Sequence, residues 1–282
     1  MARTTIDTWN PEFLKLSPIF DSIRDVAQPF TQLEQWPTLQ QFVAEFSKRD
    51  ISSFNGTQIQ PVEQGYTPEK FDDHYESRIY LKGELQTRLE NWHDFFNATA
   101  WLQFPKIKSA LNSLHYETSK NREAGTNRSP LENAIALFDE CGSIIVADDE
   151  KYLELIRNHQ WKEIFWDNQD AWGSNNSSGH VQCYVFGHAM HEKALTPYLG
   201  MTTHNIMLTQ ESGFFQKDFL EQLSIIDQTI SDIWLRKKIE KAKELQPLPL
   251  LGIPAWWKEK QDSKFYDNQD YFRLLNKQSQ RE

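Results

Sequence analysis

The sequence contains little cysteine, little glycine and no long apolar run. Only Cys141 and Cys183 occur in its 282 residues, so a disulfide framework is excluded and we expect both thiols to stay reduced. Its 11 glycines fall below the average share of about 7%, which disfavours glycine-rich nucleotide-binding loops. No apolar run approaches the roughly 20 residues of a membrane span, and the first residues lack a signal-peptide pattern. We therefore expect a cytoplasmic protein with no membrane partner.

Basic residues are also fewer than acidic residues, 30 against 40. The formal net charge of -10 and the pI near 5.3 disfavour a general nucleic-acid binder, which would present a basic face. Aromatic residues are abundant, with 18 Phe, 10 Trp and 9 Tyr. Because each aromatic ring buries about 150–250 Å², we expect a core dominated by aromatic side chains.

Hydrophobic periodicity predicts an α+β fold that is predominantly helical with a small, mainly antiparallel sheet. Helices are expected over 89–102, 105–117, 130–138, 152–165, 188–195 and 215–243, strands over 143–147 and 180–186, and a hairpin over 77–87. No repeat or long linker interrupts the chain. We expect a single domain over 1–282, with an elaborated helical part at 9–50 and with the helix and aromatic tail of 215–282 packed on the core.

Histidines and acids recur at helical spacings between residues 91 and 193. His93 lies four residues before Asn97, and Asn112 lies three before His115, so each pair shares a helix face. His188 begins a helix directly after a strand, where functional groups are common. Neutral imidazole and carboxylate oxygens bind zinc and similar divalent ions. The candidate metal ligands are His93, His115, His188, Asp94 and Asp139.

A metal bound there would activate water, and the sequence therefore suggests a metal-assisted hydrolase. Glu192 or Glu140 is the candidate general base. An anionic small molecule is the candidate substrate, bound by Arg88, Lys106, Arg128, Asn97 and Asn112. No G-x-S-x-G motif supports a serine hydrolase, and neither cysteine has the surroundings of a nucleophile.

Two alternatives stay open. Taken singly, each histidine is more often a satisfied core residue than a ligand, so the same side chains could form a non-catalytic polar network that fixes helix packing. A nuclease or a nucleic-acid accessory factor would use the locally basic stretch at 101–128, although the net charge opposes it.

Six motifs carry a resemblance to a known family. They are YESRI at 75–79, the G-x-x-x-T-R of Gly83 to Arg88, NWHDFFNA with WLQFPKIKSALNSLH at 91–115, LFDECG at 137–142, FGHAMHEK at 186–193 and FYDNQDYFR at 265–273. In them the chain resembles the bacterial proteins grouped as domain of unknown function 3025. The resemblance implies a cytoplasmic protein, mainly of proteobacteria, without an assigned activity, so no catalytic residue carries over. His191 departs from the apolar or variable residue associated with that position, which places it behind His188 as a candidate ligand.

Overall fold

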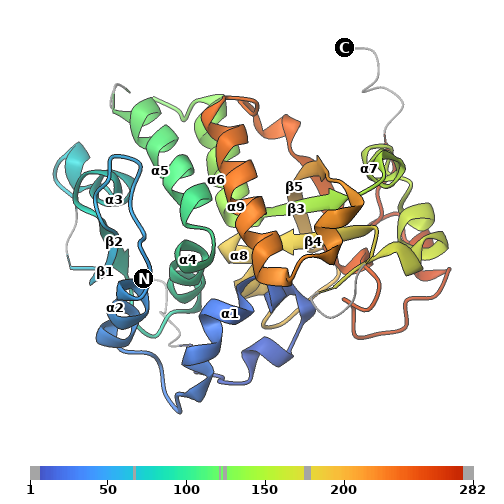
Figure 1. The fold of residues 1–282 in the computed structure, drawn as a ribbon, viewed down its shortest axis with the longest axis horizontal. Helices are drawn as coiled ribbons and strands as arrows, with labels where there is room; N and C mark the ends of the chain where they lie inside the picture. Colours follow the sequence, from blue (N-terminus) through green and yellow to red (C-terminus); the bar gives the residue numbers. More distant parts are fainter. Residues whose placement is uncertain (1–6, 66–67, 121, 123–125, 175–178, 276–282) are drawn as a thin grey trace.

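The computed structural model describes residues 7–65, 68–120, 122, 126–174 and 179–275. The fold is α+β and about half helical, with a four-stranded mixed sheet and a separate two-stranded parallel sheet (Figure 1). The helices are α1 (Arg24–Ala27), α2 (Leu39–Ser47), α3 (Tyr75–Lys82), α4 (Trp92–Gln103), α5 (Pro105–Ser119), α6 (Pro130–Cys141), α7 (Glu150–Arg157), α8 (His188–Lys193) and α9 (Phe219–Leu235). The strands are β1 (Gln60–Glu63), β2 (Glu84–Thr87), β3 (Gly142–Ala147), β4 (Val181–Val185), β5 (Thr202–Thr209) and β6 (Gln246–Pro249).

The larger sheet has the strand order β4-β3-β5-β6. β3 pairs antiparallel with β4 and parallel with β5, and β5 pairs antiparallel with β6. The expected α+β class is confirmed, and two of the three pairings in this sheet are antiparallel. The parallel β3–β5 pair makes the sheet mixed. The reason is the long connection through α7, β4 and α8, which returns the chain to the sheet in the same direction as β3.

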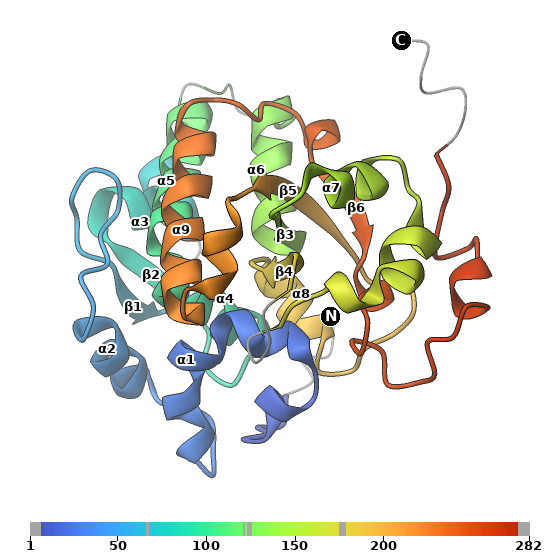
Figure 2. The ribbon, with the colours of Figure 1, turned by 45° about the vertical axis from the view of Figure 1, so that its right-hand side comes forward.

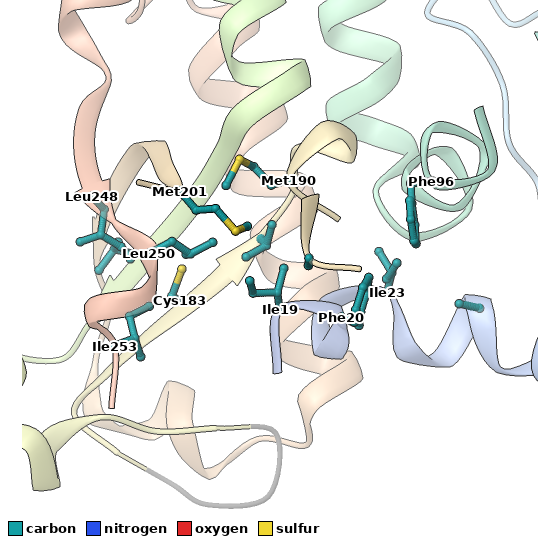
Figure 3. Close-up of a cluster of buried hydrophobic side chains, with 14 of the residues drawn as sticks. Ile19, Phe20, Ile23, Phe96, Cys183, Met190, Met201, Leu248, Leu250 and Ile253 are labelled. Carbon is teal, nitrogen blue, oxygen red and sulfur yellow. The ribbon is translucent and has the colours of Figure 1, made fainter. Parts of the chain in front are cut away.

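The sheet separates two hydrophobic cores, because successive side chains of a strand point to opposite faces. Ile145 and Cys183 belong to one core, whereas Ile144 and Tyr184 belong to the other. The second core is completed by α5, α6 and α9, which stand on one face of the sheet (Figure 2). The N-terminal segment and part of the C-terminal segment pack into the first core. Ile19 of the N-terminal segment lies near Cys183 there (Figure 3).

Aromatic rings fill the first core around α4, as the composition predicts. The ring of Trp9 stacks on Trp92 with centroids 4.9 Å apart, and Phe13 meets Phe95 edge-on at 5.5 Å. These contacts bury one face of α4 against the N-terminal segment. They fix the orientation of the helix whose first turn carries His93.

The C-terminal aromatic segment packs beside the sheet, on the residues that precede β5 and follow β6. The Tyr271 hydroxyl donates to the Met201 carbonyl at 2.7 Å and accepts from the Leu251 amide at 2.9 Å. Tyr266 and Phe272 are buried beside Phe165. Among the described residues, no helix combines the length and the apolar character needed to cross a membrane.

The hairpin expected over 77–87 is wrong. Residues through Lys82 form α3, which ends at Gly83 with a φ of 70°, and β2 then pairs parallel with β1. Gly83 acts as a left-handed helix cap rather than a hairpin turn, and a Cβ there would lie 1.9 Å from the Gln58 carbonyl oxygen. The helix expected over 215–243 is also shorter, because Asp218 caps its start and Lys237 adopts a φ of 52° just beyond its end.

Candidate metal centre

Two backbone features place His93 and His188 opposite each other. The Asn91 side chain accepts a hydrogen bond from the Asp94 amide at 3.0 Å and caps the N-terminus of α4. His93 therefore lies in the first turn of this helix. Gly187 joins β4 to α8. No larger residue fits at this position, because a Cβ would lie 2.5 Å from the Glu140 carbonyl oxygen. This close approach brings the start of α8, and with it His188, against the end of α6.

The side chains of His93, Glu140 and His188 converge at this junction. The two Nε2 atoms are 3.2 Å apart, and His188 Nε2 lies 3.6 Å from Glu140 Oε2. One ligand atom from each of the three residues lies within 4.8 Å of the other two. Two imidazole Nε2 atoms this close share either a proton or a cation. The group therefore could hold a metal ion.

Each histidine has a carboxylate behind its other ring nitrogen. Glu192 Oε2 lies 3.0 Å from His93 Nδ1, and Asp139 Oδ2 lies 3.7 Å from His188 Nδ1. Metal-binding histidines typically have such carboxylate partners, which fix the tautomer and the ring orientation. The Asp139 contact is longer than a hydrogen bond and would need a small movement to close.

Burial and charge set the protonation of the cluster. Burial lowers the pKa of His188 to about 3, against the opposing effect of Asp139, so this imidazole is neutral at pH 7. The hydrogen bond to Glu192 raises the pKa of His93, and Glu140 adds to the effect. Burial also raises the pKa of Glu140 above its ordinary value.

A buried lysine organises the layer beneath the histidines. The Lys108 ammonium donates to Asp139 Oδ1 at 2.6 Å and to Asn97 Oδ1 at 2.8 Å. Burial opposes ionisation of Asp139, but the positive charge of Lys108 outweighs it and holds the pKa of Asp139 below its ordinary value. Asn97 in turn donates to the Tyr75 hydroxyl at 2.5 Å. The contacts connect α3, α4, α5 and α6.

A cleft of about 790 Å³ opens beside this cluster. Asp139 and Glu140 form part of its wall, and Glu140 is nearly half exposed. Its other polar lining residues include His74, Tyr75, His115, Arg122, Arg128 and Lys70. The volume lies within the range of about 300–1,000 Å³ that is typical of small-molecule sites.

Several predicted site residues lie outside the three-residue group. Asp94 pairs with Arg88 through both carboxylate oxygens, at 2.8 and 3.0 Å. His115 lines the cleft, but it does not join His93 and His188 within the group. Asn112 donates to the Glu76 carboxylate at 2.6 Å.

The three predicted anion-binding cations are also dispersed. Arg128 lines the cleft, whereas Arg88 and Lys106 are not among its lining residues. The Lys106 backbone amide donates to Asp227, and its side chain is exposed. Only Arg128 of these three is placed to face a ligand in the cleft.

Sequence reasoning overlooked Lys108 and Tyr75. Lys108 precedes Asn112 by four residues and His115 by seven, so the three share one face of α5. That spacing predicts that Lys108 lies beside Asn112 and His115 in the polar cluster. Tyr75 opens α3 and had no comparable signal, because its partner Asn97 is 22 residues away.

The described geometry lies within a recognised family region. A family model described as a protein of unknown function (DUF3025) matches residues 59–276. The chain belongs to this family. The match contains all of α3 to α9 and therefore the whole cluster and its cleft. Searches of curated proteins and of solved structures found no match.

Proposed function

We propose that this DUF3025 protein is a metal-dependent hydrolase whose metal is held by His93, His188 and Glu140. The observation that carries the proposal is the spacing of the three ligand atoms. A tetrahedral ion with bonds of about 2.0–2.1 Å separates two of its ligand atoms by about 3.3 Å. The separations of 3.2 Å between the imidazoles and 3.6 Å from His188 to Glu140 are close to that value. The ligand atoms of His93 and Glu140, within 4.8 Å of each other, would move closer on binding.

The outer carboxylates support the same assignment. Glu192 contacts His93 and Asp139 faces His188, so both ligating rings would have an acceptor for the proton on Nδ1. In this arrangement Glu140 is a ligand and Glu192 orients His93, so neither needs to be the general base expected from the sequence.

The open cleft supports a catalytic rather than a structural ion. Structural zinc sites have four protein ligands, whereas catalytic sites have three and leave one position for water or substrate. Glu140 lies on the cleft wall, so that position would face a ligand there. A divalent ion in such a site activates bound water and polarises the substrate.

An anionic substrate is favoured by two cations of the cleft. Arg122 is paired with the buried Glu132, but Lys70 and Arg128 have no ion-pair partner among the described residues. They are available to a carboxylate or a phosphate. Nuclease activity would use the same cations, and a diester substrate tests for it.

Metal content tests the proposal. Protein incubated with zinc and then gel-filtered should retain about one equivalent by elemental analysis, and His188→Ala should retain almost none. His180→Ala is the matched control, because His180 also lies 3.0 Å from a carboxylate, that of Asp148, outside the cluster. Nitrophenyl esters of acetate, phosphate and phosphodiester type should reveal a hydrolysis that is lost together with the metal.

Failure of the wild-type protein to retain zinc, manganese, cobalt or nickel would overturn the proposal. The contacts of Lys108 with Asn97 and Asp139 would then favour the non-catalytic alternative, a polar network that fixes the packing of α4, α5 and α6.

A further inference from the structure

Tyr75 lies where the polar network meets the cleft. It lines the large cleft together with Asp139 and Glu140, and together with Lys108 it also lines a small cavity of about 20 Å³. Three successive hydrogen bonds connect its hydroxyl to Asp139, through Asn97 and Lys108. It is therefore a polar group beside the ligand cluster for which the metal proposal has no role.

The donors and acceptors of the network fix the direction of every hydrogen bond. An ammonium group only donates, so the oxygen of Asn97 must face Lys108 at 2.8 Å. The amide nitrogen of Asn97 then faces Tyr75 at 2.5 Å. Because that nitrogen also only donates, the Tyr75 oxygen accepts, and its own proton must go to another group. Among the described residues, the Tyr75 hydroxyl donates no hydrogen bond and is only the acceptor from Asn97.

We propose that Tyr75 donates this hydrogen bond to an oxygen of the substrate bound in the cleft. The proposal rests on the metal-dependent hydrolase proposed above. The acceptor belongs to a phosphoryl or carboxyl group, the oxygen of which gains negative charge when water attacks. A preorganised donor aimed at such an oxygen stabilises that charge. Tyr75 keeps its proton throughout and forms no covalent bond with the substrate.

The charges around Tyr75 agree with a neutral donor. Burial raises the pKa of Tyr75 well above its ordinary value, and Glu76, Asp94 and Asp139 raise it further, so the phenol stays protonated. Two of these carboxylates are already engaged, Asp139 by Lys108 and Asp94 by Arg88. An incoming anion would thus meet the tyrosine hydroxyl beside carboxylates whose charge is compensated.

Anion binding to Tyr75→Phe tests the inference. Inorganic phosphate and acetate are titrated by calorimetry into zinc-loaded and metal-free protein. We expect the Kd of at least one anion to rise about tenfold in Tyr75→Phe, as for the loss of a hydrogen bond to a charged group, with zinc content unchanged. The responding anion distinguishes phosphoryl from carboxyl recognition.

Tyr80→Phe is the control. Tyr80 lies on the same helix and stacks on Tyr116 with ring centroids 4.2 Å apart, and it is not among the residues that line the cleft. It should bind both anions as the wild type does. Equal affinity in Tyr75→Phe and wild type, or no binding of either anion by wild type, overturns the inference. Absence of zinc from wild type overturns the proposed function instead, and the metal-free titration still decides the role of Tyr75.

Discussion

Nε2 of His93 lies 3.2 Å from Nε2 of His188, although 95 residues separate them in the sequence. Each histidine occupies the first turn of a short helix, α4 or α8, and each helix is fixed from outside the site. Aromatic packing on Trp92 fixes α4, and the contact of Gly187 with the end of α6 fixes α8. The pair is therefore held by the fold and needs little rearrangement to share one ion.

Glu192→Gln should weaken zinc binding without abolishing it. The carboxylate of Glu192 accepts from His93, and loss of such an outer partner typically lowers metal affinity about 10–100-fold. Competition with a chromophoric chelator measures the change. Asp148→Asn removes the same kind of carboxylate contact from His180 and should leave the zinc affinity unaltered. Equal affinities in Glu192→Gln and wild type would show that the carboxylate of Glu192 does not support metal binding through His93.

Much of the fold follows from local pattern. The helices α4, α5 and α6 and the buried strands β3 and β4 lie within a few residues of their expected bounds, because caps such as Asn91 and prolines such as Pro105 mark them. β5 was not predicted, since its polar residues obscure its alternation. Its pairing with β3 is a long-range contact that no local pattern reports.

The candidate site was only partly predictable for the same reason. His93 and His188 each stand out by spacing, and both joined the group. His115 shares a helix face with Asn112, but that face points toward the cleft and α3 rather than toward α8. Glu140 was expected as a base, and its nearness to His188 depends on Gly187, which sequence alone marks only as a strand end.

Lys108→Met should destabilise the protein by up to about 3 kcal/mol, because it leaves the half-buried carboxylate of Asp139 without its ammonium partner. The double variant Lys108→Met with Asp139→Asn should lose less than the sum of the two single losses. Urea unfolding of the four proteins gives the coupling energy. Lys106→Met, at an exposed neighbouring position, should change stability by no more than about 0.5 kcal/mol. Additive losses would mean that Asp139 does not depend on Lys108.

Asp227→Asn should change how stability depends on pH. Burial raises the pKa of Asp227 from 3.8 to about 6, although the carboxylate accepts the backbone amides of Lys106 and Ile107. Between about pH 4 and 6 the folded protein therefore binds more protons than the unfolded chain, and stability present at low pH is lost as pH rises. Relative to wild type, Asp227→Asn should gain up to about 3 kcal/mol between about pH 4 and 7. Denaturant unfolding of both proteins across that pH range measures this difference in stability. Parallel profiles of stability against pH for Asp227→Asn and wild type would refute the prediction.

Both thiols should react slowly in the native protein. Burial raises the pKa of Cys183 to about 12 and also raises that of Cys141, so little thiolate forms at neutral pH. A chromogenic thiol reagent should modify Cys183 only as fast as the protein unfolds, and both cysteines at once in denaturant. Cys183→Ala should cost about 1 kcal/mol through lost packing and leave zinc content unchanged. Rapid native labelling at Cys183 would contradict its buried position.

The C-terminal segment should belong to the cooperative fold. The Tyr271 hydroxyl joins the Met201 carbonyl to the Leu251 amide. In Tyr271→Phe the Leu251 amide would be left buried without that partner, whereas the Met201 carbonyl would keep the Leu250 amide. The expected loss is about 1–3 kcal/mol in urea unfolding, whereas Tyr198→Phe, at a half-exposed position, should be neutral. Removal of residues 255–282 should lower the Tm further, because the loss of Tyr266 and Phe272 would expose the apolar surface around Phe165. A truncated protein that melts at the wild-type temperature would show that this segment is a detachable element, and the single domain expected over 1–282 would then have to end before it.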